Sequence, residues 1–574
     1  MKSYLSFKLI LLGEIMLSGL RRKFYLIDLA LTLFAFVLWL ISSFLARISL
    51  ATNGMGELGL FSVLPVSYYI SVAVLVFSFL TTLHFDTKNK IPVLLCQSLL
   101  LIVFLNLTPA LIEGTARFTT SYYNFVSVDR ITQTGYVAVQ SNWVYNWPSF
   151  SILMSEFAQI TSIPASTILL VYPTFFNILL LPSLLLFFRA LNVDRKIAWI
   201  ATWFVYFGFW TSQDYFSMQS IAFFISILIL FLFFKNLNAG KQPRQWVVLV
   251  FLLFLYIVSS HFLTSLALIT ILAIFFLFRQ LRRPFILIGF VLLVVSWTTF
   301  YAYNYLSENS IVILEQFLNL TLIFQRNIEN RIATGSDAHI LVAQSRVFYS
   351  LVMAFFGLLG FLMLLKNRKL NIGDKRVLIL LIGLGALVFT VSYGGELFER
   401  VYMFSLLPLA YFAVRGSMFK KQVFVMLAIF LICLAPALNI IAHYGSETMD
   451  YVPTSEIFGV NFLYNSTTSG NVLGGSSLFG DMRDLSYHAN YTLFSFRDVW
   501  LGNNSASLWN KPNDVSAGRY ICISYETRVF SSYFLGDPSF INNIEGNITV
   551  SGDYDLLYSN PSLSIYYSRP LVYD

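Results

Sequence analysis

The chain has 574 residues, of which 57% are hydrophobic, 17% aromatic and only 11% charged, and its mean hydropathy is +0.71. Soluble domains are about 25% charged, so this composition excludes a soluble globular protein and indicates a polytopic membrane protein. The 37 Lys and Arg residues exceed the 29 Asp and Glu residues, an excess that in a membrane protein first informs on topology. The three cysteines lie far apart without a CxxC pair, so the sequence predicts neither a disulfide framework nor a zinc site.

Residues 1–24 carry basic residues and an apolar stripe but no small-residue cleavage site, which predicts a cytoplasmic interfacial helix and not a removed signal peptide. Apolar runs then follow that approach the roughly 20 residues needed to span a hydrocarbon core. The thirteen runs are 25–46, 63–83, 91–110, 167–188, 197–212, 219–234, 246–260, 262–278, 284–303, 347–365, 377–393, 401–414 and 422–441. We therefore predict an all-α polytopic bundle of about thirteen transmembrane helices over 25–441.

The basic residues alternate from one connecting segment to the next. Of the 37 Lys and Arg residues, 24 lie in every second segment, starting with the N-terminus, and only 13 lie in all the others, the long tail included. Short basic loops stay in the cytoplasm. This pattern predicts an integral plasma (or equivalent) membrane protein with its N-terminus inside and its C-terminus outside.

Three long segments fall on the predicted outer side, namely the loops 111–166 and 304–346 and the tail 442–574. Short alternating runs in the tail, such as 518–525, are typical of strands, and its net charge is −7. We expect a small β-rich extracytoplasmic domain there. Six N-x-S/T sequons suit an N-glycosylated outer surface, although segments rich in Asn, Ser and Thr also produce sequons without glycosylation. They begin at Asn106, Asn319, Asn465, Asn490, Asn503 and Asn547.

The loop 111–166 carries the most informative pattern. Asp129 lies in a polar stretch that we interpret as a loop, and an aromatic step ending at Pro148 precedes an apolar run that contains Glu156. A proline suits the first turn of a helix, and a run of about 15 residues is too short to span. The sequence therefore predicts a helix along the outer interface before the next span.

This order of an acidic residue, an aromatic–proline step and a surface helix resembles the GT-C superfamily of membrane glycosyltransferases. The resemblance implies sugars carried on polyprenyl phosphates or diphosphates, about a dozen spans and, in many members, an external C-terminal domain. It also implies a catalytic Asp in the first external loop, which matches Asp129 as general base or as a holder of the acceptor or a metal. The chain departs from the family in that this loop follows the third span, and in lacking a clear Asp-x-Asp or WWDYG-like motif.

Other candidate substrate-binding residues lie at the predicted outer ends of helices. A guanidinium suits the departing lipid phosphate, and aromatic or acidic side chains suit a sugar. The candidates are Asp214, Tyr215, His261, Arg326, Arg331, Arg346, Glu399 and Arg400. Each also has an ordinary reading as a helix-end charge, ion-pair partner or packing residue. Glu113 closely follows the third span, where an interfacial end residue is the simpler interpretation and catalysis the alternative.

These features predict transfer of a sugar from a polyprenyl-(di)phosphate carrier to a protein, lipid or glycan acceptor at the outer face, with no nucleic-acid partner. A divalent metal, Mg or Mn, is an undetermined cofactor. One alternative is a transporter or flippase for lipid-linked cargo, and another is a non-catalytic surface protein whose tail docks partners. A transporter is expected to carry ionisable residues at the middle of its helices, whereas here the acidic residues gather near the predicted outer ends.

Overall fold

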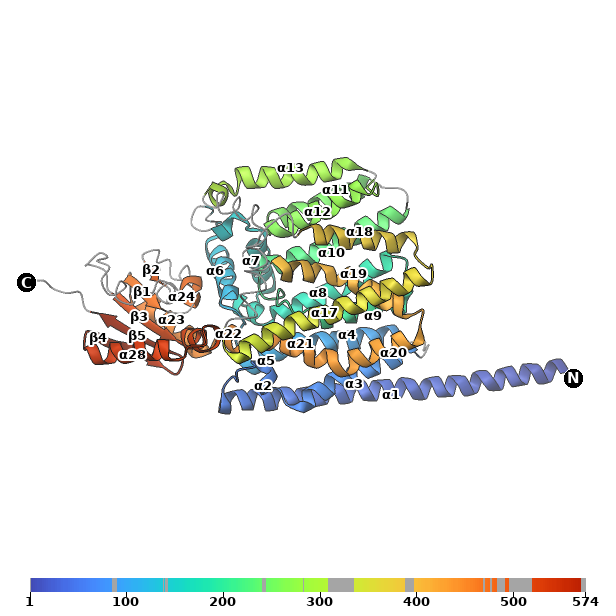
Figure 1. Cartoon of the computed structure of the whole chain (residues 1–574), viewed down its shortest axis with the longest axis horizontal. Helices are drawn as coiled ribbons and strands as arrows, with labels where there is room; N and C mark the ends of the chain where they lie inside the picture. The colour runs from blue at the N-terminus through green and yellow to red at the C-terminus, as the bar shows by residue number, and fades with distance from the viewer. Residues whose placement is uncertain are drawn as a thin grey trace, which may run out of the picture.

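The computed structural model describes residues 2–84, 90–137, 139, 143–239, 244–281, 283–307, 335–387, 397–467, 470–474, 477–482, 491–494 and 519–568. Long helices form one bundle, and a smaller domain with a β-sheet lies against one end of it (Figure 1). The N-terminus of the first helix projects from the opposite end (Figure 1). We call the end of the bundle that carries the sheet domain the domain end.

A helix forms most of each of the thirteen predicted apolar runs, as far as the structure describes them. These helices are α1 (Lys2–Asn53), α3 (Val66–His84), α4 (Lys90–Asn106), α8 (Ala165–Ala190), α9 (Arg195–Gly208), α10 (Met218–Ala239), α11 (Arg244–Val258), α12 (Phe262–Leu277), α13 (Pro284–Phe300), α17 (Asp337–Lys366), α18 (Ile372–Ala386), α19 (Leu397–Ser417) and the continuous α20 (Lys421–Ile429), η4 (Phe430–Leu434) and α21 (Ala435–Tyr444). Within the described ranges, seven helices are long and apolar enough to cross a membrane, and four more are apolar but shorter. The number of spans stays a prediction. Residues 2–24, expected as an interfacial helix, continue α1 without a break.

The first two long helices are attached to α4 by polar groups inside the bundle. The buried Gln97 of α4 lies within hydrogen-bond distance, through its Nε2, of Thr32 on α1 (3.1 Å), Ser78 (3.0 Å) and Thr82 (3.1 Å) on α3. Such hydrogen bonds hold helices together where lipid gives no hydrophobic driving force. Helices α1 and α3, which precede α4, are therefore part of the bundle.

Short helices at the domain end form the loop predicted over 111–166. They are α5 (Thr108–Glu113), α6 (Thr119–Thr134), η1 (Trp143–Asn146) and α7 (Ser149–Thr161). Helix α7 begins directly after Pro148, which confirms the predicted helix start. Helices α6 and α7 lie across the ends of the long helices (Figure 1). The interpretation of Asp129 as a loop residue is wrong, because it lies on α6, whose buried residues Asn124, Val128 and Ile131 follow the i, i+4, i+7 spacing of a helix.

The sheet domain follows α22 (Glu447–Asp450). Its elements are α23 (Thr454–Ser466), β1 (Gly470–Gly474), α24 (Ser477–Met482), β2 (Tyr491–Phe494), β3 (Arg519–Ser524), α27 (Tyr525–Val529), η6 (Phe530–Phe534), α28 (Ser539–Ser551), β4 (Tyr554–Asn560) and β5 (Leu563–Ser568). The strand order is β2-β1-β3-β5-β4, with β1 parallel to β2 and β3, and β5 antiparallel to β3 and β4. Strand β3 confirms the strand predicted at 518–525. The helices between the strands make the domain mixed α/β, which strand periodicity alone did not predict.

The sheet domain is packed onto the bundle and is not a loose tail. The backbone N–H of Ser336, just before α17, donates to the carbonyl of Tyr533 at 2.8 Å, and the Tyr533 hydroxyl reaches the Gly445 carbonyl at 3.4 Å. Ala338, Val529 and Tyr533 form a small buried core between the two parts. Helix α24 also packs on α6. The domain is thereby fixed over the ends of α17 and α21.

Close packing of α17 on α19 depends on two glycines. A Cβ on Gly360 would collide with the carbonyl oxygen of Phe412, and one on Gly416 with the backbone of Gly360. We expect Gly360→Ala to lower the free energy of unfolding by about 1–3 kcal/mol, the usual penalty of overpacking. Thermal unfolding in detergent, followed by intrinsic fluorescence, measures the change. Gly385→Ala on α18 is the matched control, since its Cβ meets nothing within 4 Å; equal unfolding temperatures for the two variants would contradict the prediction.

Candidate functional site

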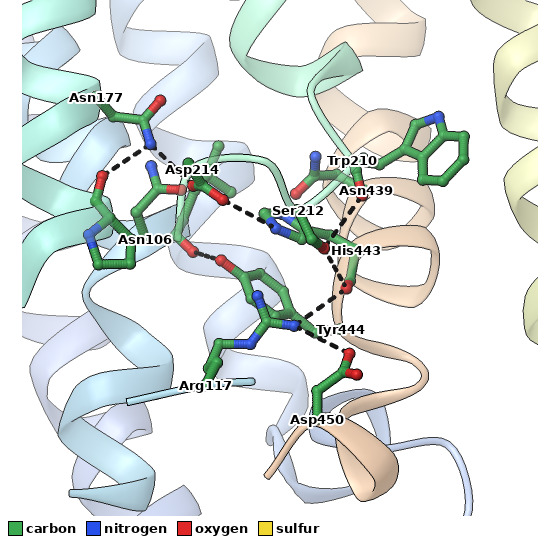
Figure 2. Close-up of polar contacts among 12 residues, drawn as sticks. Asn106, Arg117, Asn177, Trp210, Ser212, Asp214, Asn439, His443, Tyr444 and Asp450 are labelled. Carbon is green, nitrogen blue, oxygen red and sulfur yellow. Dashed lines mark hydrogen bonds and ion pairs between the residues drawn. The ribbon is translucent and has the colours of Figure 1, made fainter. Parts of the chain in front are cut away.

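Ionisable side chains from four separate parts of the chain meet at the domain end. They come from the end of α5 and the segment after it, the α9–α10 connection, the last turn of α21, and α22. The members are Glu113, Arg117, Asp214, His443, Glu447 and Asp450. We call this group the acidic cluster. Figure 2 shows several of its members pointing toward one another from these segments.

Arg117 is the cation of the acidic cluster. Its side chain is 8% exposed and pairs with Glu447 through both carboxylate oxygens, and its Nη2 lies 3.5 Å from Asp450 (Figure 2 shows the Asp450 contact). The guanidinium also lies over the rings of Phe118 and Tyr444, 4.7 and 4.5 Å from their centroids. Because a guanidinium can bind a carboxylate in a bidentate way and stack on aromatic rings at once, these contacts fix its position.

Asp214 lies between an amide and an imidazole. Asn177 of α8 donates to its Oδ2 at 2.9 Å, and His443 Nε2 lies 3.7 Å from its Oδ1 (Figure 2). Asp214 is only 2% exposed. Burial opposes its ionisation, but the contact with His443 and the charge of Arg117 together hold the pKa of Asp214 below its usual value. The buried carboxylate is therefore ionised and oriented at neutral pH.

Two other acids of the cluster, Glu113 and Asp450, have pKa values above their ordinary range. Burial raises the pKa of Glu113 well above its ordinary range, and the negative charge of Glu447 adds to this, while Arg117 counteracts it. Neither carboxyl oxygen of Glu113 has a hydrogen-bond partner within the part of the chain that the structure describes. Neighbouring carboxyl groups whose environments push their pKa values apart are typical of acid–base sites.

Asp450 makes stability depend on pH. Burial, followed by the charge of Glu447, raises its pKa from 3.8 to about 7. The folded protein therefore binds more protons than the unfolded chain between about pH 4 and pH 7, so this contribution to stability falls as the pH rises through that window. We expect the unfolding temperature of the wild type to fall more between pH 5 and pH 8 than that of Asp450→Asn. The difference between the two decreases should be on the order of a few degrees. Parallel losses in differential scanning fluorimetry would contradict this.

A pocket opens beside the acidic cluster, between α5 and α8. Its cavity volume is about 20 Å³, roughly the room that one water molecule needs. The side chains of Arg117, Asp214 and Tyr215 form part of its wall. The other lining residues are Asn106, Pro109, Ala110, Thr115, Ala116, Ser121, Leu169, Leu170, Pro173, Phe216 and Tyr444. The ionised Asp214 thus borders a small, partly open pocket.

Two further arginines, Arg346 and Arg400, and the imidazole of His261 also lie at the domain end. Arg400 at the start of α19 is buried, and its charge, after burial itself, lowers the pKa of His261 to about 3, so this imidazole is neutral. His261 caps α12 by accepting from the backbone N–H of Thr264 at 3.3 Å. Arg346 donates to the Ala442 carbonyl at 2.8 Å, and its charge reaches Asp450. Arginine side chains at this end of the bundle are suited to stabilise an anionic leaving group.

The structure brings several of the predicted site residues to the domain end, but it does not join Asp129 to them. Asp214 and Tyr215 border the pocket, the charges of Arg346 and Glu399 reach Asp450, and Arg400 acts on His261. Arg326 and Arg331 lie outside the described residues.

Asp129 lies ten residues along α6 from Thr119, roughly 15 Å at 1.5 Å per residue. It accepts a hydrogen bond from Gln133 at 2.6 Å, and partial burial raises its pKa. Its placement therefore separates it from the start of α6, where Arg117 lies.

Four members of the acidic cluster were not predicted from the sequence. In the sequence, His443, Glu447 and Asp450 fall in the predicted tail 442–574, and Arg117 falls in the predicted loop 111–166. The one available signal was that all four lie within ten residues after a predicted span, on the same predicted side of the membrane.

The sequons fall into three groups. Asn465 and Asn547 are exposed, so both are accessible to a glycan. Asn106 is an exception, because it is buried, donates to the Ile102 carbonyl at 3.1 Å and lines the pocket; it does not suit glycan attachment. Asn319, Asn490 and Asn503 lie outside the described residues.

No group of three His, Cys, Asp or Glu side chains in the described ranges lies close enough to hold a metal ion. The dependence on Mg or Mn therefore stays a prediction. Removing divalent cations with a chelator during a transfer assay is the direct way to measure it.

A scan against protein-family models and a search of curated proteins each returned no match. Among solved structures, the chain is similar to the oligosaccharyltransferase of Archaeoglobus fulgidus tethered to an acceptor peptide, at 12% identity and a TM-score of 0.48, covering 79% of this chain and 72% of that one. The chain is also similar to ArnT of Cupriavidus metallidurans bound to undecaprenyl phosphate, at 11% identity and a TM-score of 0.45, covering 84% of this chain and 98% of that one. For the mycobacterial arabinofuranosyltransferase AftD, the identity is 13% and the TM-score 0.46, and the match covers 84% of this chain and 42% of that one.

This chain thus spans less than half of AftD. All three structures are GT-C enzymes, the superfamily that the sequence resembles. Identities of 11–13% leave the activity to be argued from the site residues of this chain.

Proposed function

We propose that the chain is a GT-C-type membrane glycosyltransferase that moves a sugar from a polyprenyl-(di)phosphate carrier to a hydroxyl acceptor at the outer membrane face. The observation that supports this best is the buried, ionised Asp214, which borders a pocket and is held by Asn177 and His443. A carboxylate that is oriented, charged and next to an accessible space can remove a proton from a bound hydroxyl.

The charges around Asp214 suit the remaining parts of such a transfer. The acceptor oxygen attacks the anomeric carbon while Asp214 takes its proton, which contributes typically about 10²–10⁴-fold to the rate. The bond from the anomeric carbon to the carrier phosphate breaks, and the phosphate leaves with the electron pair. Arg346 and Arg400 are the candidates to meet its negative charge, because a guanidinium matches two phosphate oxygens.

The predicted topology explains why a lipid carrier is needed. The described basic connections, such as those between α8 and α9 and between α17 and α18, lie at the end of the bundle opposite the sheet domain, so the positive-inside rule favours an outer position for the domain end. Nucleotide sugars are made in the cytoplasm and do not reach that side. A sugar donor for this site must therefore arrive attached to a membrane lipid.

The proposal is tested with the purified protein in liposomes that contain a panel of radiolabelled polyprenyl-phosphate and polyprenyl-diphosphate sugars, together with membrane extract as acceptor. We expect one donor to lose its label to the acceptor and to release the free polyprenyl phosphate. Protein-free liposomes are the control. If no donor is consumed but the labelled lipid moves between leaflets in a protein-dependent way, the transporter interpretation replaces the enzyme.

A further inference from the structure

The chain enters the sheet domain through α22, and both acids of this short helix contact the same arginine of the bundle. Arg117, between α5 and α6, pairs with both carboxylate oxygens of Glu447 and lies 3.5 Å from Asp450. The backbone N–H of Phe118 also donates to the Asp450 carbonyl at 2.8 Å. The entry to the sheet domain is therefore held on the bundle by charge as well as by backbone hydrogen bonding.

Acids outnumber cations at this contact. Glu113, at the end of α5, is a third acid within reach of Arg117, and both Glu113 and Glu447 are buried. The charged groups that act on Asp450 are Arg117, Arg346, Glu399 and Glu447. Those that act on Glu113 are Arg117, Glu447 and Asp450. The tyrosines around Glu113, which are uncharged near neutral pH, are Tyr122, Tyr451 and Tyr525. If every acid of this set were ionised, the contact would carry a surplus of negative charge.

Docking of the domain therefore depends on how many of these acids carry a proton. Burial, together with the charge of Glu447, raises the pKa of Glu113 well above its ordinary range and that of Asp450 to about 7. In a detached domain, Asp450 would lie in water and regain a pKa near 4. The docked state thus binds more protons between about pH 4 and pH 7, so docking weakens as the pH rises through that window.

We propose that the acidic cluster is a pH-sensitive switch for docking of the sheet domain. At acidic pH, α22 lies against Arg117 and the domain is held on the bundle. Above neutral pH, the added carboxylate charges repel one another, and α22 and the domain loosen from the segment between α5 and α6. This inference does not depend on the glycosyltransferase function, because docking can be measured without a donor or an acceptor.

Hydrogen exchange of the full chain in nanodiscs, followed by mass spectrometry between pH 5 and pH 8, tests the switch. Exchange times are scaled at each pH to the intrinsic exchange rate. Peptides of α22 and of η6 report docking, since η6 packs against the bundle through Tyr533. Peptides of α28 report folding of the domain itself, because Ile541 and Ile548 lie in the core of the sheet domain.

We expect the protection of α22 and η6 in the wild type to fall at least about 10-fold from pH 5 to pH 8, while the protection of α28 stays constant. Asp450→Asn and Glu113→Gln mimic the protonated acids, and each should keep more of this protection at pH 8. In Asp553→Asn an exposed acid of the same domain is neutralised, and this control should behave as the wild type.

Constant protection of α22 in the wild type, or an equal loss in the wild type and both neutral variants, would overturn the switch. A loss that includes α28 to the same extent would also overturn it, because the domain would then be unfolding and not detaching. If one variant fails to fold, the other still decides, since each removes one of the two acids with raised pKa values.

Discussion

Asp214→Asn is expected to reduce sugar transfer by about 10²–10⁴-fold, the range that a general base typically contributes. The asparagine has the size of the aspartate and its carbonyl oxygen can still accept the hydrogen bond from Asn177, which lies 2.9 Å from Oδ2 in the wild type. It carries no negative charge and cannot accept a proton from the acceptor. The defect should therefore appear in kcat more than in KM, because the binding surface of the pocket is preserved.

The measurement compares wild type, Asp214→Asn and Asp129→Asn at equal amounts in liposomes with the same donor. Asp129 is the base implied by the family resemblance, and Asn is an equally conservative change there. Near-normal transfer by Asp129→Asn with strong loss in Asp214→Asn supports the assignment. The reverse result would return the role of base to Asp129 and leave Asp214 as a buried structural acid. Unfolding temperatures of both variants show whether a loss of transfer comes from misfolding.

Glu113→Gln tests whether Glu113, whose pKa is raised, takes part in proton transfer as Asp214 is proposed to do. Burial raises the pKa of Glu113 well above its ordinary range, which favours the uncharged carboxyl group, so an amide in its place is expected to change the charge little. If Glu113 has no part in proton transfer, Glu113→Gln should retain most of the activity. A loss as large as that of Asp214→Asn would identify Glu113 as a proton donor or acceptor in the reaction.

The bundle could be predicted from the sequence because its signal is local. A run of apolar residues such as 219–234 must become a helix in lipid, where every backbone polar group needs a partner within the segment. The start of α7 could be predicted for the same reason, since Pro148 and the apolar residues after it lie within a few positions of one another. The helices of the sheet domain were missed because they are short and mixed with polar turns.

The site could be predicted only in part, because its contacts join residues far apart in the chain. Asp214 attracts attention in the sequence as an acid in a short outer connection, but its partner His443 lies more than 200 positions away. Asp129 attracted attention through its position in the expected loop, whereas burial and charge partners decide which carboxylate is ionised. No periodicity in the sequence reports that Arg117 meets Glu447.

The charge of Arg117 is what makes the acidic cluster stable, and Arg117→Met is expected to destabilise the fold by about 3–5 kcal/mol. The methionine replaces the stem of the side chain but leaves Glu447, which is fully buried, without its cation. Burying an unpaired carboxylate is costly, so either the protein loses stability or Glu447 takes up a proton. Chemical unfolding in detergent at pH 7.5 measures the loss.

Two further variants decide whether charge is the cause. Adding Glu447→Gln to Arg117→Met removes the unpaired carboxylate and should restore much of the lost stability, since a buried pair replaced as a whole is often nearly neutral. Arg528→Ala provides a surface control, because Arg528 pairs with Glu545 at 2.6 Å but is 42% exposed, and such pairs contribute at most about 1 kcal/mol. A double variant as unstable as Arg117→Met alone would show that Arg117 acts through its packing on Phe118 and Tyr444 and not through its charge.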